Sequence, residues 1–252
     1  MKKPLIIILS VVIIIILGVV GYFVWDSLNH EPIIDIIPSG EDVVEDEGLA
    51  AKAIVETLEI VDNATGSNRL IDAKYPSVLS FKNKDLQNSV NKQIREVILA
   101  YRDEILVMID EETPSTALYT YKTTYEKLAN GDYLSLVISN DYQTGGIRSN
   151  KWKDIYNIDV RNERIFKLED IFPANVDYKD EILYQIELQA ENNNYTLMNG
   201  AGLKDLQDNQ KFYIDDGKLI IYFDPAEIAP ATYGILQFEM PFTLGEDGLF
   251  RI

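Results

Sequence analysis

Two adjacent glycines, Gly145-Gly146 in the stretch DYQTGGIRSN, are the residues whose type and spacing first suggest chemistry. A glycine-rich turn can cradle a phosphate when a helix follows it, because the first backbone N–H groups of that helix point at the anion. Here IRSN and a strand pattern follow Gly146, and no Gly-Lys-Ser/Thr sequence comes after it. The pattern therefore favours a turn between antiparallel strands, where glycine accepts a positive φ angle.

The alternative at this turn is an exposed recognition loop, because arginine and tryptophan are enriched where interfaces concentrate binding energy. Its contact residues would be Tyr142, Gln143, Gly145, Gly146, Arg148 and Trp152. A position of Trp152 in the core is the competing interpretation.

A second recognition segment is expected between Asp224 and Gly234. Pro225 and Pro230 stiffen this stretch, and Ile228 and Tyr233 could project apolar groups into a ligand groove. The competing interpretation is a corner that packs its own isoleucine and tyrosine against a sheet. The expected ligand contacts here are Pro225, Ile228 and Tyr233.

Adjacent acids are frequent but do not indicate catalysis. Glu169-Asp170, Asp215-Asp216 and Glu246-Asp247 all fall in predicted turns. Neighbours along a chain do not set the opposed geometry, with carboxyl groups roughly 5–10 Å apart, that glycosidases need. Asp215-Asp216-Gly217 is not followed by the spaced oxygen ligands of a calcium loop. Turn and capping roles are therefore expected for all three pairs.

Histidine and cysteine chemistry is nearly absent from the sequence. The chain has no cysteine, and its one histidine is His30, close to the predicted membrane segment. Ser-His-Asp catalysis, thiolate nucleophiles and Cys/His zinc sites consequently have no other candidate residues. We expect a protein that is not an enzyme, with no metal site and no cofactor.

An uncharged apolar run from Leu5 to Trp25 predicts a transmembrane anchor. At about 1.5 Å per residue it spans a hydrocarbon core of about 30 Å. A cleaved signal peptide is the alternative, but Tyr22 and Phe23 stand where small residues would be needed. Lys2 and Lys3 keep the N-terminus in the cytoplasm, so the rest of the chain is expected outside the cell as part of a single-pass membrane protein.

The charge balance is strongly acidic. The chain has 23 Lys and Arg against 41 Asp and Glu, a net charge of −18, and every acid follows Trp25. Such a surface disfavours nucleic acid and favours cationic partners, although it also serves plain solubility.

The elements that must position these residues follow from hydrophobic periodicity. Apolar residues spaced by three and four predict one long helix over 84–110, and alternating patterns predict strands at 51–60, 69–79, 117–128, 133–142, 152–160 and 164–168. The helix face comprises Leu86, Val90, Ile94, Val97, Tyr101, Ile105 and Ile109. Asn130-Gly131 predicts a tight turn. One helix on an antiparallel meander gives an α+β fold.

Five segments are predicted along the chain. They are a cytoplasmic stub at 1–4, the anchor at 5–25, an acidic stalk at 26–48, a first α+β subdomain at 49–168 and a second, smaller one at 169–252. The second subdomain is expected to hold a helix at 178–189, a hairpin at 212–214 and 218–223, an irregular loop at 225–234 and a last strand at 235–242.

The order of several stretches resembles an extracytoplasmic bacterial module. The stretches are YPSVL (75–79), DYQTGGIRSN (141–150), YNIDV (156–160), LEDIF (168–172) and KLIIYFDPAEIAPATYGILQFEMPF (218–242), with the long helix after the first. The module resembles the lysozyme-binding outer domain of RsiV-type anti-sigma factors and a region that precedes the catalytic domain of PdaC-type peptidoglycan deacetylases. The resemblance covers residues 50–245 and implies binding of lysozyme or peptidoglycan.

Two departures from this family limit what carries over. The family often has a Gly-Gly-Ala-His turn, whereas Gly145, Gly146, Ile147 and Arg148 occupy the matching positions here, so no role of that histidine transfers. With MKKP before the apolar run and an end at Ile252, we also expect neither a folded anti-sigma segment nor a deacetylase domain.

The expected function is a membrane-anchored extracytoplasmic binding or sensing module of the bacterial cell envelope. Its ligand would be a cationic protein such as lysozyme, or peptidoglycan. The alternatives are a wall-glycan hydrolase that acts through carboxylates and an accessory subunit of an envelope complex.

Overall fold

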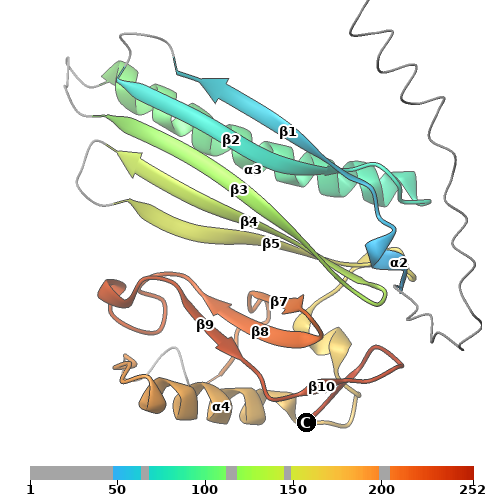
Figure 1. Ribbon diagram of the computed structural model, residues 1–252. Coiled ribbons are helices and arrows are strands. Elements are labelled where there is room, and N and C mark those ends of the chain that lie inside the picture. The colour runs from blue at the N-terminus through green and yellow to red at the C-terminus, as the bar shows by residue number, and fades with distance from the viewer. Residues whose placement is uncertain (1–47, 64–67, 112–117, 145–148, 199–204) are drawn as a thin grey trace, which may run out of the picture. The chain divides into compact units, whose positions relative to one another are not determined.

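Six strands form the larger sheet of the computed structural model, in the order β1-β2-β3-β4-β5-β6 (Figure 1). The strands are β1 (Val55–Asp62), β2 (Arg69–Val78), β3 (Tyr119–Asn130), β4 (Tyr133–Thr144), β5 (Asn150–Asp159) and β6 (Arg164–Ile165). The structure describes residues 48–63, 68–111, 118–144, 149–198 and 205–252, which lie in one compact unit. The α+β class predicted from the sequence is confirmed.

The long helix α3 (Lys84–Glu111) packs on one face of this sheet. Asn83 begins it, because its side-chain Oδ1 accepts hydrogen bonds from the backbone N–H groups of Asp85 and Leu86 at 3.1 and 3.0 Å. The predicted apolar face is confirmed where Val90 and Ile94 are fully buried. A further core residue was missed by the sequence pattern, since Ile98 is also fully buried.

The predicted antiparallel meander is wrong for one pair of strands. β2 and β3 are parallel, with Arg69 opposite Tyr119 and Ala73 opposite Thr123. The reason is the length of α3, which at 28 residues covers about 42 Å and returns the chain to the end of the sheet where β2 began. A strand that follows such a crossover must run parallel to the strand before it.

Two tight hairpins confirm the turn signals in the sequence. Gly131 and Asp132 connect β3 to β4, and Gly131 has a φ angle of +58°, which suits the first central position of a type II′ turn. Asp216 and Gly217 connect β7 (Phe212–Asp215) to β8 (Lys218–Phe223) with φ angles of +47° and +71°. Positive angles at both positions are typical of a type I′ turn.

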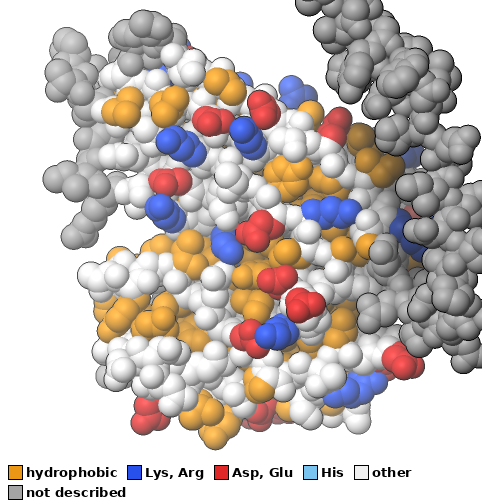
Figure 2. All heavy atoms as spheres, in the orientation of Figure 1, with side chains coloured by type: hydrophobic (Ala, Val, Ile, Leu, Met, Phe, Trp, Pro, Cys, Tyr) orange, Lys and Arg blue, Asp and Glu red, His pale blue; other side chains and the backbone are white. Residues whose placement is uncertain are grey.

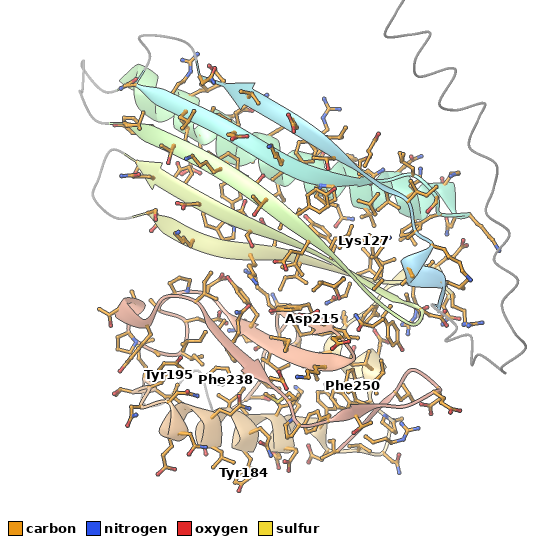
Figure 3. The ribbon with its side chains drawn as sticks, in the orientation of Figure 1. Lys127, Tyr184, Tyr195, Asp215, Phe238 and Phe250 are labelled. Carbon is orange, nitrogen blue, oxygen red and sulfur yellow. The ribbon has the colours of Figure 1, made fainter. Side chains whose placement is uncertain are left out.

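The C-terminal part of the chain builds a second core. Its elements are η1 (Leu168–Ile171), α4 (Tyr178–Asn192), β7, β8, η2 (Ala231–Tyr233), β9 (Leu236–Glu239), β10 (Thr243–Leu244) and β11 (Phe250–Arg251). β7, β8 and β9 form one antiparallel sheet. Phe238 and Phe250 are almost fully buried in this core, whereas Tyr184 points from α4 into solvent (Figure 3). The predicted last strand is shorter than expected and ends at Glu239.

Buried amide and hydroxyl groups join β7 to the larger sheet. Ser135 of β4 donates to Asn157 Oδ1 of β5 at 2.7 Å and accepts from Ile214 N at 3.2 Å. Asn157 Nδ2 donates to Phe212 O at 2.8 Å, and Asn130 Nδ2 donates to Ile214 O at 2.9 Å. Side chains thus satisfy backbone groups of β7 that would otherwise be buried without partners.

The first described residues contact the turn of the β3–β4 hairpin. The short helix α2 (Gly48–Ala51) donates from Ala50 N to Gly131 O at 3.1 Å, and Lys127 Nζ donates to Ala53 O at 2.6 Å. The predicted anchor at 5–25 and the predicted stalk up to residue 47 lie outside the described residues. None of the described helices is both long and apolar enough to cross a membrane. The predicted subdomain boundary at 168/169 stays a prediction.

Candidate functional site

The described ends of the two predicted recognition segments lie at the same end of the molecule (Figure 1). β4 ends and β5 begins there, and so does the connection that carries η2 between β8 and β9. Gly145, Gly146 and Arg148 lie outside the described residues, so their predicted contacts stay predictions. Gln143 lies near the end of β4, opposite Thr120, and is partly exposed.

Tyr142 and Trp152 pack into an aromatic cluster beneath α3. Tyr142 is only 6% exposed, and the ring of Trp152 lies 4.6 Å from the ring of Tyr101 and 6.2 Å from that of Tyr142. Burial, reinforced by the negative charge of Glu104, raises the pKa of Tyr142 to about 12. These rings therefore support the end of the sheet from within, which agrees with a core position for Trp152.

Lys153 connects the two segments. Successive side chains of a strand point to opposite faces of the sheet, so the side chain of Lys153 lies on the face opposite Trp152. Its backbone N–H donates to the hydroxyl of Tyr222 at 2.8 Å, and its Nζ donates to Gln237 Oε1 at 2.9 Å. Tyr222 in turn donates to Asp224 Oδ1 at 2.8 Å. The first residues of β5 are thus bonded to Tyr222 of β8, through it to Asp224 at the start of the second segment, and to Gln237 of β9.

Lys211 completes this network. Its Nζ donates to Asp224 Oδ2 at 2.6 Å and to Lys153 O at 3.2 Å. Burial lowers the pKa of Lys153 and raises the pKa of Asp154, although a hydrogen bond from Asn140 opposes the second shift. The indole N–H of Trp152 also favours the charged form of the Asp154 carboxyl. This N–H makes no hydrogen bond of normal geometry to a described residue. The network gives each of these charges a polar partner and bonds the start of β5 to Asp224, the first residue of the second segment.

The second segment divides into a buried half and an exposed half. Pro225 is half-buried, and Ile228 is 2% exposed within the C-terminal core. Glu227 accepts a hydrogen bond from Asp224 N at 2.7 Å and closes the turn between them. Burial raises the pKa of the Glu227 carboxyl. The buried half therefore acts as a corner, as the competing interpretation anticipated, and a ligand contact by Ile228 stays a prediction.

Tyr233 belongs to the exposed half and is 36% exposed. Its ring meets that of Tyr195 edge-on at 5.3 Å, and its hydroxyl lies 3.4 Å from Thr196 Oγ1. Hydrogen bonding from Thr196 lowers the pKa of Tyr233. Two tyrosines from separate loops thus form one small aromatic tip, with Pro230 at the N-terminal side of η2.

Sequence reasoning missed several residues at this end. None of Tyr195, Thr196, Lys211 and Tyr222 was predicted as a site residue. Only Lys153 had a usable signal, because the alternation in KWKDIYNIDV places it on the face opposite the tryptophan.

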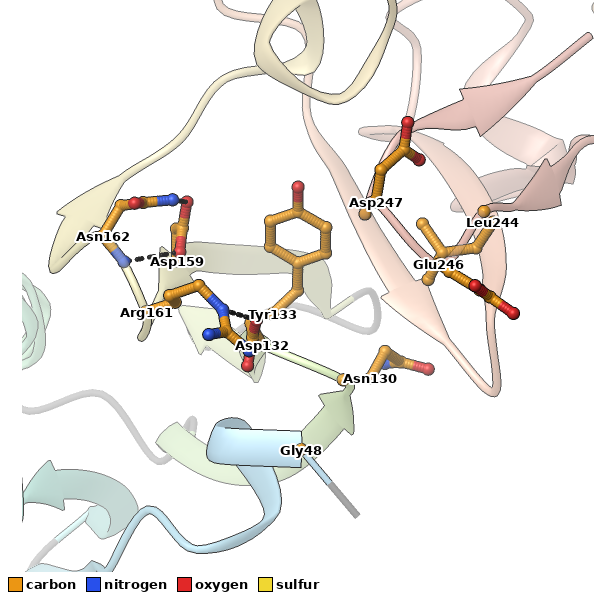
Figure 4. Close-up of a pocket in the computed structure, with 13 residues that line it drawn as sticks. Gly48, Asn130, Asp132, Tyr133, Asp159, Arg161, Asn162, Leu244, Glu246 and Asp247 are labelled. Carbon is orange, nitrogen blue, oxygen red and sulfur yellow. Dashed lines mark hydrogen bonds and ion pairs between the residues drawn. The ribbon is translucent and has the colours of Figure 1, made fainter. Parts of the chain in front are cut away.

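A hollow of about 680 Å³ lies at the C-terminal ends of β3 and β5 (Figure 4). The ring of Tyr133 stands between the turn at Asp159–Asn162 and the turn at Leu244–Gly248. Asp132 and Arg161 form an ion pair beside it. Asp159 accepts from the backbone and side-chain nitrogens of Asn162 at 2.9 and 2.7 Å. Arg164 lies 3.7 Å from Asp159, so Asp132 and Asp159 each already have a cationic partner.

The three pairs of adjacent acids have the turn and capping roles expected of them. Asp247 accepts from Leu249 N at 3.1 Å and pairs with Arg251 at 2.5 Å, while Asp170 accepts from Lys167 N at 2.7 Å. Asp215-Asp216 belongs to the β7–β8 hairpin. Within the described residues, no three or more histidines and acids are placed to hold a metal ion.

Comparison with known proteins shows what this chain resembles. Residues 169–243 match the family model described as a protein of unknown function, DUF3298. The chain is 27% identical over 205 residues to the anti-sigma-V factor RsiV of Bacillus subtilis (strain 168), covering 77% of this chain and 69% of that protein. The chain contains an RsiV-like domain. The resemblance inferred from the order of the sequence stretches is confirmed.

Solved structures of DUF3298 proteins share the fold. A member from Bacteroides fragilis superposes with a TM-score of 0.55 at 18% identity, covering 75% of this chain and 90% of that one. A DUF3298 protein from Pseudomonas aeruginosa PAO1 gives 0.53 at 13% identity, covering 77% and 93%. The DUF3298 match runs from η1 to β10, so this part of the RsiV-like domain includes the aromatic tip, whereas Lys153 precedes it.

Proposed function

We propose that this chain is an extracytoplasmic binding or sensing module that residues 5–25 anchor in the cell membrane. The similarity to an anti-sigma factor supports a sensing or binding role. The anchor rests on the uncharged run from Leu5 to Trp25, with Lys2 and Lys3 before it. In this proposal the N-terminus is cytoplasmic, residues 26–48 form a stalk, and the RsiV-like domain, with its subdomains at 49–168 and 169–252, faces outward.

The ligand in this proposal is a cationic protein, with lysozyme as the first choice and peptidoglycan as the second. The single observation that carries it is the aromatic tip that Tyr195 forms with Tyr233. Tyr233 lies in the connection between β8 and β9, the two strands that the Lys153 network bonds to β5. Tyrosine is enriched at interfaces because a large ring and a polar hydroxyl are presented with little entropy loss. The net charge of −18 favours approach of a cationic partner.

Calorimetric titration of the full chain in a mild non-ionic detergent with hen egg-white lysozyme tests this proposal. We expect Tyr233→Ala to weaken binding about tenfold or more, as is typical for the loss of an interface aromatic. Tyr184→Ala is the matched control, because Tyr184 is 58% exposed on α4 and lies outside the tip. Raising the salt from about 50 to about 500 mM should weaken binding further, because the charges become screened.

Three results would count against the lysozyme assignment. The first is no heat at low salt from protein that circular dichroism shows to be folded. The second is an equal loss in both tyrosine variants. The third is tighter binding of purified peptidoglycan than of lysozyme, which would make the glycan the ligand. Release of reducing sugars from wall preparations by the same sample would instead point to a carboxylate-dependent hydrolase.

A further inference from the structure

β1 forms the outer edge of the six-stranded sheet, and no strand in the described part of the chain pairs with its outer side (Figure 1). It reads VETLEIVD over eight residues, and its register with β2 is unbroken. Natural sheets protect such an edge with proline, a bulge or charged side chains, and β1 has no proline and no bulge, so its protection rests on three acids alone. An open edge of this length is a template for another strand.

The backbone groups that face outward can be assigned from the register. Leu79 N donates to Ile54 O at 2.9 Å, which makes Ile54 and Leu79 a hydrogen-bonded pair. Hydrogen-bonded and non-hydrogen-bonded pairs alternate along antiparallel strands. The residues whose N–H and C=O groups face away from β2 are therefore Val55, Thr57, Glu59 and Val61. Pro76, which has no N–H, lies opposite Thr57 and fits this assignment.

A groove of about 430 Å³ runs beside this edge, between β1, β2 and α3. Leu58, Tyr75 and Leu99 supply apolar walls. Lys92 and Arg95 of α3 also line it, and Lys92 is paired with Glu96 at 3.7 Å. Arg95 is exposed and has no ion-pair partner among the described residues. In a chain with so many acids, this is a place with an available positive charge beside an apolar surface.

We propose that β1 binds an extended segment of a partner protein as an added strand. The segment carries apolar side chains at alternate positions on the groove side and a carboxylate that reaches Arg95. Backbone hydrogen bonds to the outward-facing groups supply affinity, and the groove supplies specificity. This site goes beyond the proposed lysozyme binding, because it uses β1 and α3 rather than the aromatic tip.

A second copy of this chain fits the edge less well. β1 carries Glu56, Glu59 and Asp62 and no basic residue. Pairing β1 with another β1 would bring like charges together across the new ladder, which is destabilising. A partner strand with its own sequence avoids that conflict.

The test uses the full chain in detergent and a fluorescein-labelled, acetylated peptide, SVTITVTE, as the probe. Glu59→Pro removes an outward-facing N–H but no hydrogen bond to β2, so it should weaken peptide binding about tenfold or more. Glu59→Ala is the matched control, because it removes the same side chain and keeps the N–H. It should bind within about twofold of the wild type, since the Glu59–Lys74 pair is exposed. Arg95→Glu should reverse the preference, so that SVTITVTK binds more tightly than SVTITVTE.

Hydrogen exchange keeps the proposal falsifiable if Glu59→Pro does not fold. Peptide should slow exchange at Val55, Thr57, Glu59 and Val61, whose amides should exchange freely in the chain alone. Equal binding to both Glu59 variants would overturn the proposal, as would protection of those amides before peptide is added. A concentration-dependent dimer that Glu59→Pro abolishes, without peptide binding to the wild type, would assign the edge to a second copy. Lysozyme binding should be unchanged in Glu59→Pro, which separates this site from the aromatic tip.

Discussion

Tyr222 is the residue that bonds the start of β5 to Asp224, where the connection between β8 and β9 begins. Its ring is fully buried, and its hydroxyl accepts from Lys153 N and donates to Asp224 Oδ1. We expect Tyr222→Phe to lower the free energy of unfolding by about 1–3 kcal/mol, because a buried N–H and a carboxylate lose a partner. Chemical denaturation followed by circular dichroism measures this. Tyr184→Phe is the control and should change stability by less than about 0.5 kcal/mol. A loss no larger than in the control would show that water replaces the hydroxyl.

Asp154 should give stability a distinct dependence on pH. Burial raises the pKa of its carboxyl above the ordinary 3.8, with Asp224 adding to the shift and Asn140 and Lys211 opposing it. The native state therefore binds a proton more tightly than the unfolded chain does. Its contribution to stability is greatest at low pH and is lost as the pH rises from about the unfolded value through the raised one.

Asp154→Asn removes this titration and keeps an oxygen acceptor for Asn140. We expect the variant to gain stability relative to the wild type as the pH rises from below 3.8, the ordinary pKa of the carboxyl, to neutral. Urea denaturation of both proteins across that range measures the difference. A constant difference at every pH would mean that burial does not perturb Asp154. A difference that changes the other way would mean that Lys211 outweighs burial.

At the scale of elements, the contact between α2 and the β3–β4 hairpin depends on a glycine. Gly48 has a φ angle of +67°, and a Cβ atom there would lie 2.0 Å from Gly131 O. Gly217 has a φ angle of +71° but open space around it, so it is a matched control for the backbone angle alone. We expect Gly217→Ala to cost about 1 kcal/mol and Gly48→Ala at least about 2 kcal/mol more, because backbone must move. Thermal unfolding measures both. Equal losses would show that α2 can detach without cost.

The same elements show which features the sequence could predict. α3 and both tight hairpins are local, since spacings of three and four, Asn130-Gly131 and Asp215-Asp216-Gly217 act within a few residues. The parallel pairing of β2 with β3 is not local, because it depends on where the chain arrives after a 28-residue crossover. Alternation predicts strands equally well in either direction.

The candidate site was predictable only in part for a related reason. The stretch from Asp224 to Tyr233 stood out by its prolines, but Tyr195 comes from a loop more than 30 residues earlier and meets Tyr233 only after folding. The Lys153–Tyr222 bond likewise joins residues 69 positions apart. Nothing in either local sequence marks its partner, since such contacts depend on how the two sheets pack.

At the scale of the whole molecule, the two cores should unfold together. Backbone groups of β7 are satisfied by side chains of the larger sheet, through Ser135, Asn157 and Asn130. If the C-terminal core opened alone, these buried polar groups would lose partners at about 1–3 kcal/mol for each. We expect a single calorimetric transition with equal van't Hoff and calorimetric enthalpies for the full chain in detergent.

Asn157→Ala tests the origin of this cooperativity, because it removes one donor to β7 and the acceptor of Ser135. We expect the variant to be less stable and its unfolding to broaden or split, since the cores then share fewer bonds. Asn162→Ala is the control, because among the described residues Asn162 bonds with Asp159 alone, within its own turn. Tryptophan fluorescence reports on the larger sheet through Trp152. In the variant, the unfolding transition that it follows should no longer coincide with the calorimetric transition. Two resolved transitions already in the wild type would mean instead that the cores fold independently, and that the polar groups on β7 bind without coupling them.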